Sequence, residues 1–240
     1  MINIRTANER GHANHGWLNS WHTFSFANYF DPHERGFSDL LVINDDTVAP
    51  GRGFGAHPHH DMEIFSYVLE GALSHQDSMG NGATIHAGDI QLMSAGSGVV
   101  HSETNNSLKD HVHFLQIWIV PNKSHQTPRY QQIHLSQTEK QGKLQLIMAP
   151  KSHSEKVMEI RQDTYIYAGR IRQSDHFSFA LNTERYYYLH VATGTLNMNG
   201  LSLKAGDGAK IRQEEALHFS EGNDAEILLF DLRPHLLPER

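Results

Sequence analysis

The sequence predicts an all-β protein. Its apolar stretches are short, and turn-forming residues such as glycine, asparagine and proline recur about every 8–12 residues. Stretches with helical periodicity are scarce. The two halves of the chain also share one pattern: Val68-Leu-Glu-Gly71 followed by Ala87-Gly-Asp89 corresponds to Val191-Ala-Thr-Gly194 followed by Ala205-Gly-Asp207. Together these observations predict a duplicated β-barrel.

Several strands are expected in the first half. Each apolar segment there is followed by a turn signal; the segment 40–43, for example, ends at Asn44-Asp-Asp46. The longest segment is closed by Pro121, which cannot donate a hydrogen bond within a sheet. The expected strands are 40–43, 64–69, 72–76, 90–93 and 112–120.

The polar stretch 121–150 carries Pro121, Pro128 and Pro150 and is expected to be a connection. The alternation of strands and turns resumes after it, with a turn expected at Thr193-Gly194. The strands expected in the second half are 185–191, 195–200 and 227–232, and the segment 203–208 carries the turn signal Ala205-Gly-Asp207. We therefore predict an N-terminal metal-binding domain (1–125), a connecting segment (126–150) and a C-terminal domain without a metal site (151–240).

Composition excludes several classes of protein. Among the 240 residues, 38% are hydrophobic and 20% are charged, as in an ordinary globular protein. The net charge is −7 and the basic residues are scattered, which argues against a nucleic-acid partner. The chain has no cysteine, so disulfides and thiolate sites are excluded. The sequence shows no signal peptide and no apolar run that could span a membrane, so we expect a cytoplasmic protein without membrane contact.

The chain contains 19 histidines. Random placement alone would give about 1.5 His-x-His pairs, and the sequence has two, at 57/59 and 111/113. A His-x-His pair is therefore informative only through its surroundings. His57 and His59 follow a glycine-rich stretch that begins at Gly51, and Gly96 and Gly98 precede His101.

The spacing around these glycines predicts a metal centre. His57 and His59 are two residues apart, as are His101 and Glu103, so each pair shares one face of a strand. Two adjacent strands would offer three imidazoles and one carboxylate to one divalent transition metal ion. Fe(II) suits this set best, and Cu, Ni, Mn, Co or Zn can compete. The alternative is that the four residues are ordinary polar residues on a strand face.

Three further residues are weighed as parts of the site. Glu63 shares the parity of His57 and His59, and it is a reserve ligand or a hydrogen-bond acceptor for one of their rings. His111 and His113 form a rival pair at the entry to a strand, where exposed histidines are common, and we interpret them as structural.

The aromatic residues near the glycine-rich stretch have two interpretations. They either line a pocket for a flat substrate or fill the core of the barrel, which is the more common role of aromatic side chains. The residues concerned are Trp17, Trp21, Phe24, Phe26 and Phe54.

Gly51 with His57-Pro-His59, and His101 with Asn105, match the two motifs of the cupin superfamily. The chain is also closely similar to the pirin family, with a match that runs from residue 5 to about residue 130. The matching segments are Arg10-Gly-His12, His22-Thr-Phe-Ser-Phe26, Val42-Ile-Asn-Asp-Asp46, Gly53-Phe-Gly-Ala-His-Pro-His59, Asp61-Met-Glu63, Tyr67-Val-Leu-Glu-Gly71, His75-Gln-Asp-Ser-Met-Gly80, Met93-Ser-Ala-Gly96 and His101-Ser-Glu103.

The resemblance implies a bicupin fold of two packed β-barrels, and a carboxylate ligand that comes from the second motif, as Glu103 does. It also implies a quercetin 2,3-dioxygenase-type reaction, in which a flavonol ring is cleaved with O₂ and carbon monoxide is released. Glu103 is then a candidate base for the flavonol hydroxyl as well as a ligand.

A second hypothesis is an iron-binding regulatory protein that acts through protein partners. A third is a cupin that acts on another small molecule, since fold and metal do not fix the substrate. We expect a monomer.

Overall fold

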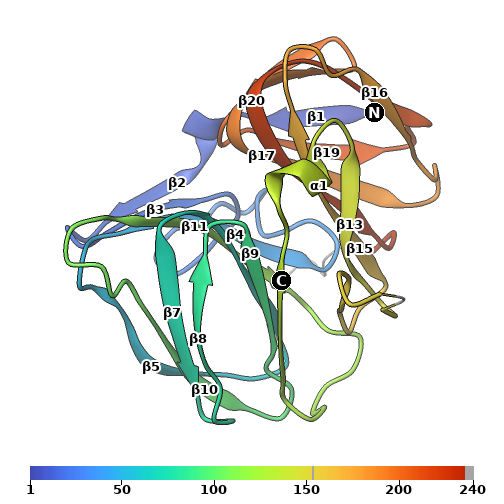
Figure 1. Ribbon diagram of the computed structural model, residues 1–240. Helices are drawn as coiled ribbons and strands as arrows, with labels where there is room; N and C mark the ends of the chain where they lie inside the picture. The colour runs from blue at the N-terminus through green and yellow to red at the C-terminus, as the bar shows by residue number, and fades with distance from the viewer. Residues whose placement is uncertain (153, 236–240) are drawn as a thin grey trace.

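The computed structural model describes residues 1–152 and 154–235. Almost every regular element in this part of the chain is a β-strand, and the helices are the 3₁₀ turn η1 (Ala7–Glu9) and the short α1 (Gln137–Lys140). The strands form a seven-stranded, a four-stranded and a nine-stranded sheet (Figure 1). The all-β prediction is confirmed. None of the helices in the described residues has the length and hydropathy needed to cross a membrane.

The seven- and four-stranded sheets make the first barrel. Their orders are β12-β9-β6-β11-β4-β3-β2 and β5-β10-β7-β8. All the strands expected in the first half are confirmed. The bounds are β2 (Gly11–Asn14), β3 (Leu18–His22), β4 (Leu40–Val48), β5 (Gly53–His59), β6 (Glu63–Glu70), β7 (Ala72–Asp77), β8 (Gly82–His86), β9 (Asp89–Ser94), β10 (Val99–Thr104), β11 (Val112–Ile119) and β12 (Arg129–His134).

One expected turn of the first half is wrong. The sequence Asn44-Asp-Asp46 does not end a strand, because β4 continues through it to Val48 and pairs with β3 and β11 along its length. Asn44 and Asp46 are buried, so this polar stretch lies inside the structure instead of at its surface. The composition of a turn misled the prediction, because Asn44 and Asp46 line a cavity instead of forming a surface turn.

The nine-stranded sheet makes the second barrel. Its main path is β1-β19-β17-β20-β15-β13-β14, with β16 paired to β20 and β18 to β17. The turn expected at Thr193-Gly194 is replaced by irregularities within the long strand β17, which help such a strand to bend. The bounds are β1 (Ile2–Arg5), β13 (Leu144–Ala149), β14 (Met158–Glu159), β15 (Thr164–Ile171), β16 (Phe177–Ala180), β17 (Tyr186–Met198), β18 (Leu201–Lys204), β19 (Gly208–Arg212) and β20 (Ala216–Leu232).

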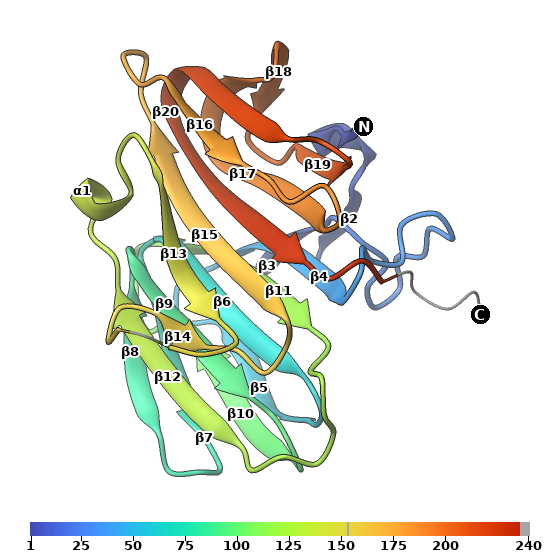
Figure 2. The ribbon, with the colours of Figure 1, turned by 90° about the vertical axis from the view of Figure 1, so that its right-hand side faces the viewer.

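A shared core joins the two barrels. Alternate residues of β6 explain it: Phe65 and Tyr67 pack in a cluster with Ile166 and Phe230 of the second barrel, while residues on the opposite face of β6, such as Val68, pack inside the first barrel. Figure 2 shows the sheet of the second barrel lying against that of the first. β6 is buried on both faces, as its nearly continuous apolar sequence requires.

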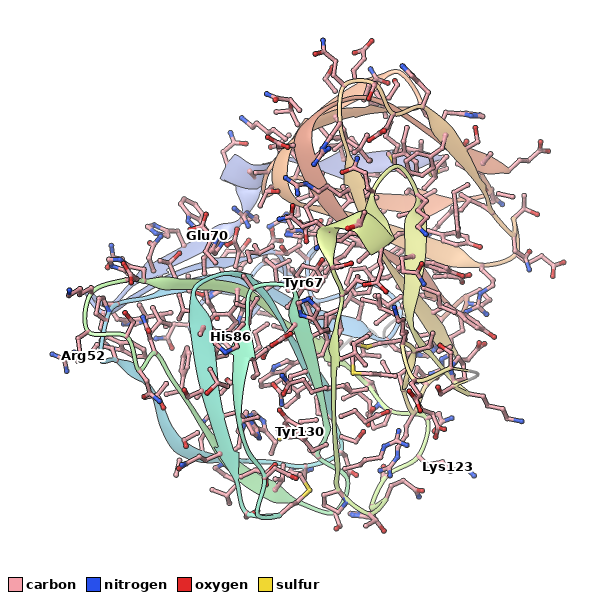
Figure 3. The ribbon with its side chains drawn as sticks, in the orientation of Figure 1. Arg52, Tyr67, Glu70, His86, Lys123 and Tyr130 are labelled. Atoms are coloured by element: carbon pink, nitrogen blue, oxygen red, sulfur yellow. The ribbon has the colours of Figure 1, made fainter. Side chains whose placement is uncertain are left out.

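A polar contact also crosses between the barrels. Lys140 of α1 is buried and its Nζ donates to Tyr67 Oη at 2.8 Å and to Glu226 of β20 (Tyr67 in Figure 3). Since the ammonium and the carboxylate are both sheltered from water, each stabilises the other there.

Strand pairing departs from the predicted domain boundaries in two places. The segment expected to be a connection contains β12, which pairs with β9 of the first barrel, and β13, which pairs with β15 of the second. β12 was missed because it is polar and half-exposed. In addition, β1 pairs with β19, so the first residues of the chain belong to the sheet of the second barrel.

Candidate metal centre

The two histidine motifs lie on neighbouring antiparallel strands, as predicted. His57 of β5 is directly opposite His101 of β10, and His59 is opposite Val99 (strands in Figure 1). A bulge between His101 and Glu103 shifts the register, so that Glu103 lies opposite Phe54. The pairing therefore brings His57 and His101 side by side.

Three imidazole rings converge at this place. Nitrogen atoms of His57, His59 and His101 all lie within 4.8 Å of one another. The Nε2 atoms of His57 and His101 are 3.0 Å apart, and the Nδ1 atom of His57 is 2.7 Å from the carbonyl oxygen of Gly55. Because only Nδ1–H can donate to that carbonyl, the Nε2 of a neutral His57 presents a lone pair to the centre.

Burial keeps two of these rings neutral at pH 7. Desolvation, together with the neighbouring His57, lowers the pKa of His59 to about 4. Desolvation, together with His57 and His59, lowers the pKa of His101 to about 3. A metal ion requires unprotonated imidazole nitrogens, so this cluster is ready to bind one.

Glu103 is buried beside His101. Its Oε1 accepts a hydrogen bond from Ser66 Oγ at 3.1 Å, and its Oε2 accepts one from Gln116 Nε2 at 2.7 Å. Burial raises the pKa of this carboxyl above its ordinary value, against the opposing influence of His75 and of these two donors. Glu103 forms a second group of candidate ligands with His75 and His101, and His101 is common to both groups.

His75, which the sequence presents only as part of a pirin-family motif, also lies at this site. It lies on β7, next to β10, and is 1% exposed. Its Nε2 is 3.1 Å from Asp77 Oδ2, and its Nδ1 is 3.5 Å from His101 Nδ1. The ring of Tyr130 packs against it with centroids 5.1 Å apart (Tyr130 in Figure 3). His75 therefore supports His101 from the side opposite His57. The His-x-Asp spacing, which places both side chains on one strand face, was the available signal.

Glu63 does not lie with the histidines. A turn separates β5 from β6, with Asp61 at φ 47°, so the parity that linked Glu63 to His57 is lost. Its Oε2 accepts hydrogen bonds from Ser94 Oγ at 2.9 Å and from the backbone N–H of Arg161 at 3.3 Å. Glu63 thus joins the first barrel to the second, and its proposed role as a reserve ligand is wrong.

The rival histidines also lie elsewhere. His113 Nε2 is 2.6 Å from Asp45 Oδ1, while His111 is exposed. Burial lowers the pKa of His113, but the hydrogen bond to Asp45 and the charge of that carboxylate outweigh it, so the net shift is upward. His113 is a partner in a structural ion pair. In the second barrel, His218 Nδ1 is 2.7 Å from Ser178 Oγ.

A cavity of about 540 Å³ opens beside the three histidines, and His57 and His59 form part of its lining. Phe26, Phe54 and Trp118 supply flat walls. The ring of Trp118 stands edge-on to those of His59 and Phe26, with centroids 5.1 and 5.5 Å away.

Each of the two interpretations of the aromatic residues is therefore correct for some of them. Phe26 and Phe54 line the cavity, whereas Phe24 is buried in the core between the barrels. Trp17 packs edge-on to Phe54, with centroids 5.3 Å apart, and Trp21 stacks on His12 at 4.0 Å.

Two β-barrels in one chain, with histidines converging inside the first, define a bicupin protein. Residues 3–119 match the family described as Pirin, and residues 146–232 match the quercetinase C-terminal cupin domain. A protein of Escherichia coli (strain K12) named quercetin 2,3-dioxygenase is 47% identical over 234 residues, which cover 98% of this chain and 100% of the relative. The chain belongs to the pirin family, and the predicted bicupin fold is confirmed.

Other relatives agree with this assignment. A pirin-like protein of Caulobacter vibrioides is 38% identical, with 96% of this chain and 99% of the relative covered. The crystal structure of bacterial pirin YhhW from Escherichia coli in complex with nickel(II) has a TM-score of 0.92 and 46% identity, with 98% and 100% of the two chains covered. That relative thus binds a transition metal of the kind that an imidazole-rich site favours.

Proposed function

We propose that this protein is a metal-dependent dioxygenase of the quercetin 2,3-dioxygenase type. It would cleave the heterocyclic ring of a flavonol with O₂ and release carbon monoxide. The observation that carries the proposal is the convergence of His57, His59 and His101 beside a cavity with flat aromatic walls. The name of the Escherichia coli relative, at 47% identity, supports the same reaction.

The metal of this proposal is one divalent transition ion bound by His57, His59, His101 and Glu103. The donor set fits such an ion. Glu103 is buried and its hydrogen-bond donors, Ser66 and Gln116, are neutral, so a cation beside it would offset the cost of burying its charge. Each carboxylate oxygen accepts one hydrogen bond and keeps a further lone pair.

Nitrogen-rich sites favour Fe, Ni, Cu, Mn, Co or Zn over Mg and Ca, which prefer oxygen ligands. We propose Fe(II) as the native ion; nickel is the ion named for the Escherichia coli relative.

Catalysis would begin with loss of the proton from the 3-hydroxyl of the flavonol. Glu103 is the proposed acceptor, because a carboxylate that binds an ion through one oxygen keeps its other oxygen for a proton. Ser66 and Gln116 hold its carboxylate in place. Phe26, Phe54 and Trp118 would keep the flat substrate aligned with the histidines. The ion, when bound, supplies positive charge that stabilises the flavonol oxyanion.

The cavity of about 540 Å³ beside the histidines supports a small-molecule reaction over the regulatory hypothesis, because contact with a protein partner would not require such a hollow. A monomeric, cytoplasmic protein stays our prediction.

Turnover by protein of known metal content tests the proposal. Metal-free protein is loaded in turn with Fe(II), Ni(II), Cu(II) and Mn(II), and its metal content is measured. Loss of quercetin absorbance and release of carbon monoxide are then followed in air. We expect equal amounts of quercetin consumed and carbon monoxide released with at least one ion. Absence of turnover with every ion, in fully loaded protein, would refute the proposed reaction.

A further inference from the structure

One wall of the cavity is polar, while Phe26, Phe54 and Trp118 line other parts of it. Asn44 and Asp46 lie two residues apart on β4 and are each 2% exposed. His22 and Ser20 of β3 are their direct cross-strand partners, and both are buried. All four line the cavity. We refer to Ser20, His22, Asn44 and Asp46 as the polar wall.

Three atoms of the polar wall lack a hydrogen-bond partner. They are Oδ1 of Asn44, Oδ1 of Asp46 and Nδ1 of His22, judged against the residues that the structure describes. More than about 90% of buried polar groups in proteins do have a partner. These three neighbouring atoms of the polar wall can therefore form hydrogen bonds with a ligand in the cavity.

The neighbouring residue Asp45, by contrast, has a structural role on the same strand. Asp45 accepts hydrogen bonds from Arg10 Nη1 at 2.9 Å and from His113 Nε2 at 2.6 Å. Those groups overcome the effect of burial and lower the pKa of Asp45 to about 2. Asp46 has no such cationic hydrogen-bond partner among residues 1–152 and 154–235.

The charge state of Asp46 follows from this difference. Burial, opposed in part by Ser20 and reinforced by the charges of Asp45 and Glu103, raises the pKa of Asp46 to about 7. A carboxyl group accepts hydrogen bonds when it is ionised, and it also donates one when it is protonated. The ionised and the protonated carboxyl of Asp46 can each form a hydrogen bond with a neutral hydroxyl group of a ligand, and neither form requires the ligand to be a cation.

The spacing of Asn44 and Asp46 on β4 restricts the kind of ligand that can contact both residues. Residues two apart on a strand are separated by about 7 Å, so Asn44 and Asp46 would contact different positions of one ligand. Phe26 and Trp118, on the lining of the same cavity, favour a flat ring system. His57 and His59 line the cavity as well, so a ligand in contact with the polar wall can also reach the histidines.

We propose that Asn44 and Asp46 form a recognition site for phenolic hydroxyl groups, which selects polyhydroxylated flavonols over flavonols that carry the 3-hydroxyl alone. The proposal rests on the proposed function for the class of ligand. It assigns specificity to residues that would not bind the metal.

Binding without oxygen tests this assignment separately from turnover. Nickel-loaded protein is titrated anaerobically with quercetin and with 3-hydroxyflavone, which lacks the other hydroxyl groups, and the two dissociation constants are compared by calorimetry. We expect quercetin to bind at least about tenfold more tightly. In Asp46→Leu and Asn44→Leu proteins that preference should fall at least about fivefold, with the affinity for 3-hydroxyflavone nearly unchanged.

Thr47→Val is the matched control, because Thr47 is the next residue of β4, follows Asp46 onto the other face and does not line the cavity. It should keep the full preference. If the leucine variants do not fold, Asp46→Ala and Asn44→Ala remove the same oxygen atoms without adding bulk.

Equal affinities of the wild-type protein for the two flavonols would overturn the proposal, as would an unchanged preference in the folded variants. If the wild-type protein turns over quercetin but binds both flavonols equally, the dioxygenase function stands and the recognition site is refuted. If it prefers quercetin but turns over neither flavonol, the recognition site stands and the dioxygenase function is refuted.

Discussion

The Nε2 atoms of His57 and His101 face each other at 3.0 Å across the neighbouring strands β5 and β10. The Nδ1–H of His57 donates to the carbonyl oxygen of Gly55, so the facing Nε2 of its neutral ring has no hydrogen to offer. Burial also holds His101 in its neutral form. Without an ion, the Nε2–H tautomer of His101 donates to this lone pair; a cation that binds both rings would take the place of that hydrogen.

Removal of His101 should therefore abolish metal binding. His101→Ala is expected to be purified with less than about a tenth of the wild-type metal content, because this residue belongs to both groups of candidate ligands. Elemental analysis of the purified proteins measures this. His111→Ala is the control: His111 is exposed, and its loss should leave the metal content unchanged. The opposite result would mean that the metal-binding histidines were misassigned.

His75 should act on the metal through His101. His75→Leu removes the ring next to His101 Nδ1 and is expected to weaken nickel binding by about 10–100-fold, the usual effect of losing a group that orients a ligand. Competition with a chromophoric chelator gives the affinity. His86→Leu, at an exposed position on β8 of the same sheet, should have no effect (Figure 3). Wild-type affinity in His75→Leu would show that His75 does not support the ligand.

Ser66 should stabilise the protein through Glu103. Ser66→Ala removes a donor to a fully buried carboxyl group, so we expect the free energy of unfolding of the metal-free protein to fall by about 1–3 kcal/mol. Urea unfolding measures the loss. In a Glu103→Leu background the same change should cost much less, because the acceptor is absent. An equal cost in both backgrounds would place the effect of Ser66 elsewhere.

His190 should make the metal-free protein less stable in acid. It is fully buried, and its two ring nitrogens lack a hydrogen-bond partner in the part of the chain that the structure describes. Burial, with the charge of Arg10, lowers its pKa to about 4. The unfolded chain, in which histidine titrates near about 6.5, takes up the proton first. This contribution to stability is therefore complete above about pH 6.5 and is lost as the pH falls toward 4.

Urea unfolding of wild-type and His190→Leu protein between pH 7 and pH 5 tests this pH dependence. The free energy of unfolding of the wild-type protein should fall more steeply toward pH 5 than that of the variant. Metal-free protein is used so that release of an ion does not contribute. Identical pH dependence in the two proteins would exclude His190 as the cause.

The sequence predicted the histidine cluster because its geometry is local. His57 and His59 are two residues apart and therefore lie on one face of a strand. The glycine motifs indicated which of the 19 histidines belong to the site. His75 was not selected, because it reaches His101 only through the pairing of β7 with β10, which no local pattern reports. The Glu63 assignment failed for a related reason: parity holds only within one strand, and a turn separates it from β5.

The polar wall is a second place where local sequence did not predict the structure. Asn44-Asp-Asp46 has the composition of a turn, yet β3 and β11 pair with it on either side and keep it extended. Polar residues inside a strand contradict local preference, and such departures are expected where a chain has a functional site. Likewise, the pairing of β1 with β19 joins residues that are far apart in the sequence.

The most direct test of the central claim is a crystal structure of the nickel- or iron-loaded protein with anomalous scattering data collected at the metal edge. The account predicts one strong peak in the first barrel, coordinated by the rings of His57, His59 and His101 and by the carboxylate of Glu103. A fully loaded crystal with its metal bound elsewhere, for example at His111 and His113, or with Glu103 turned away from the ion, would contradict it.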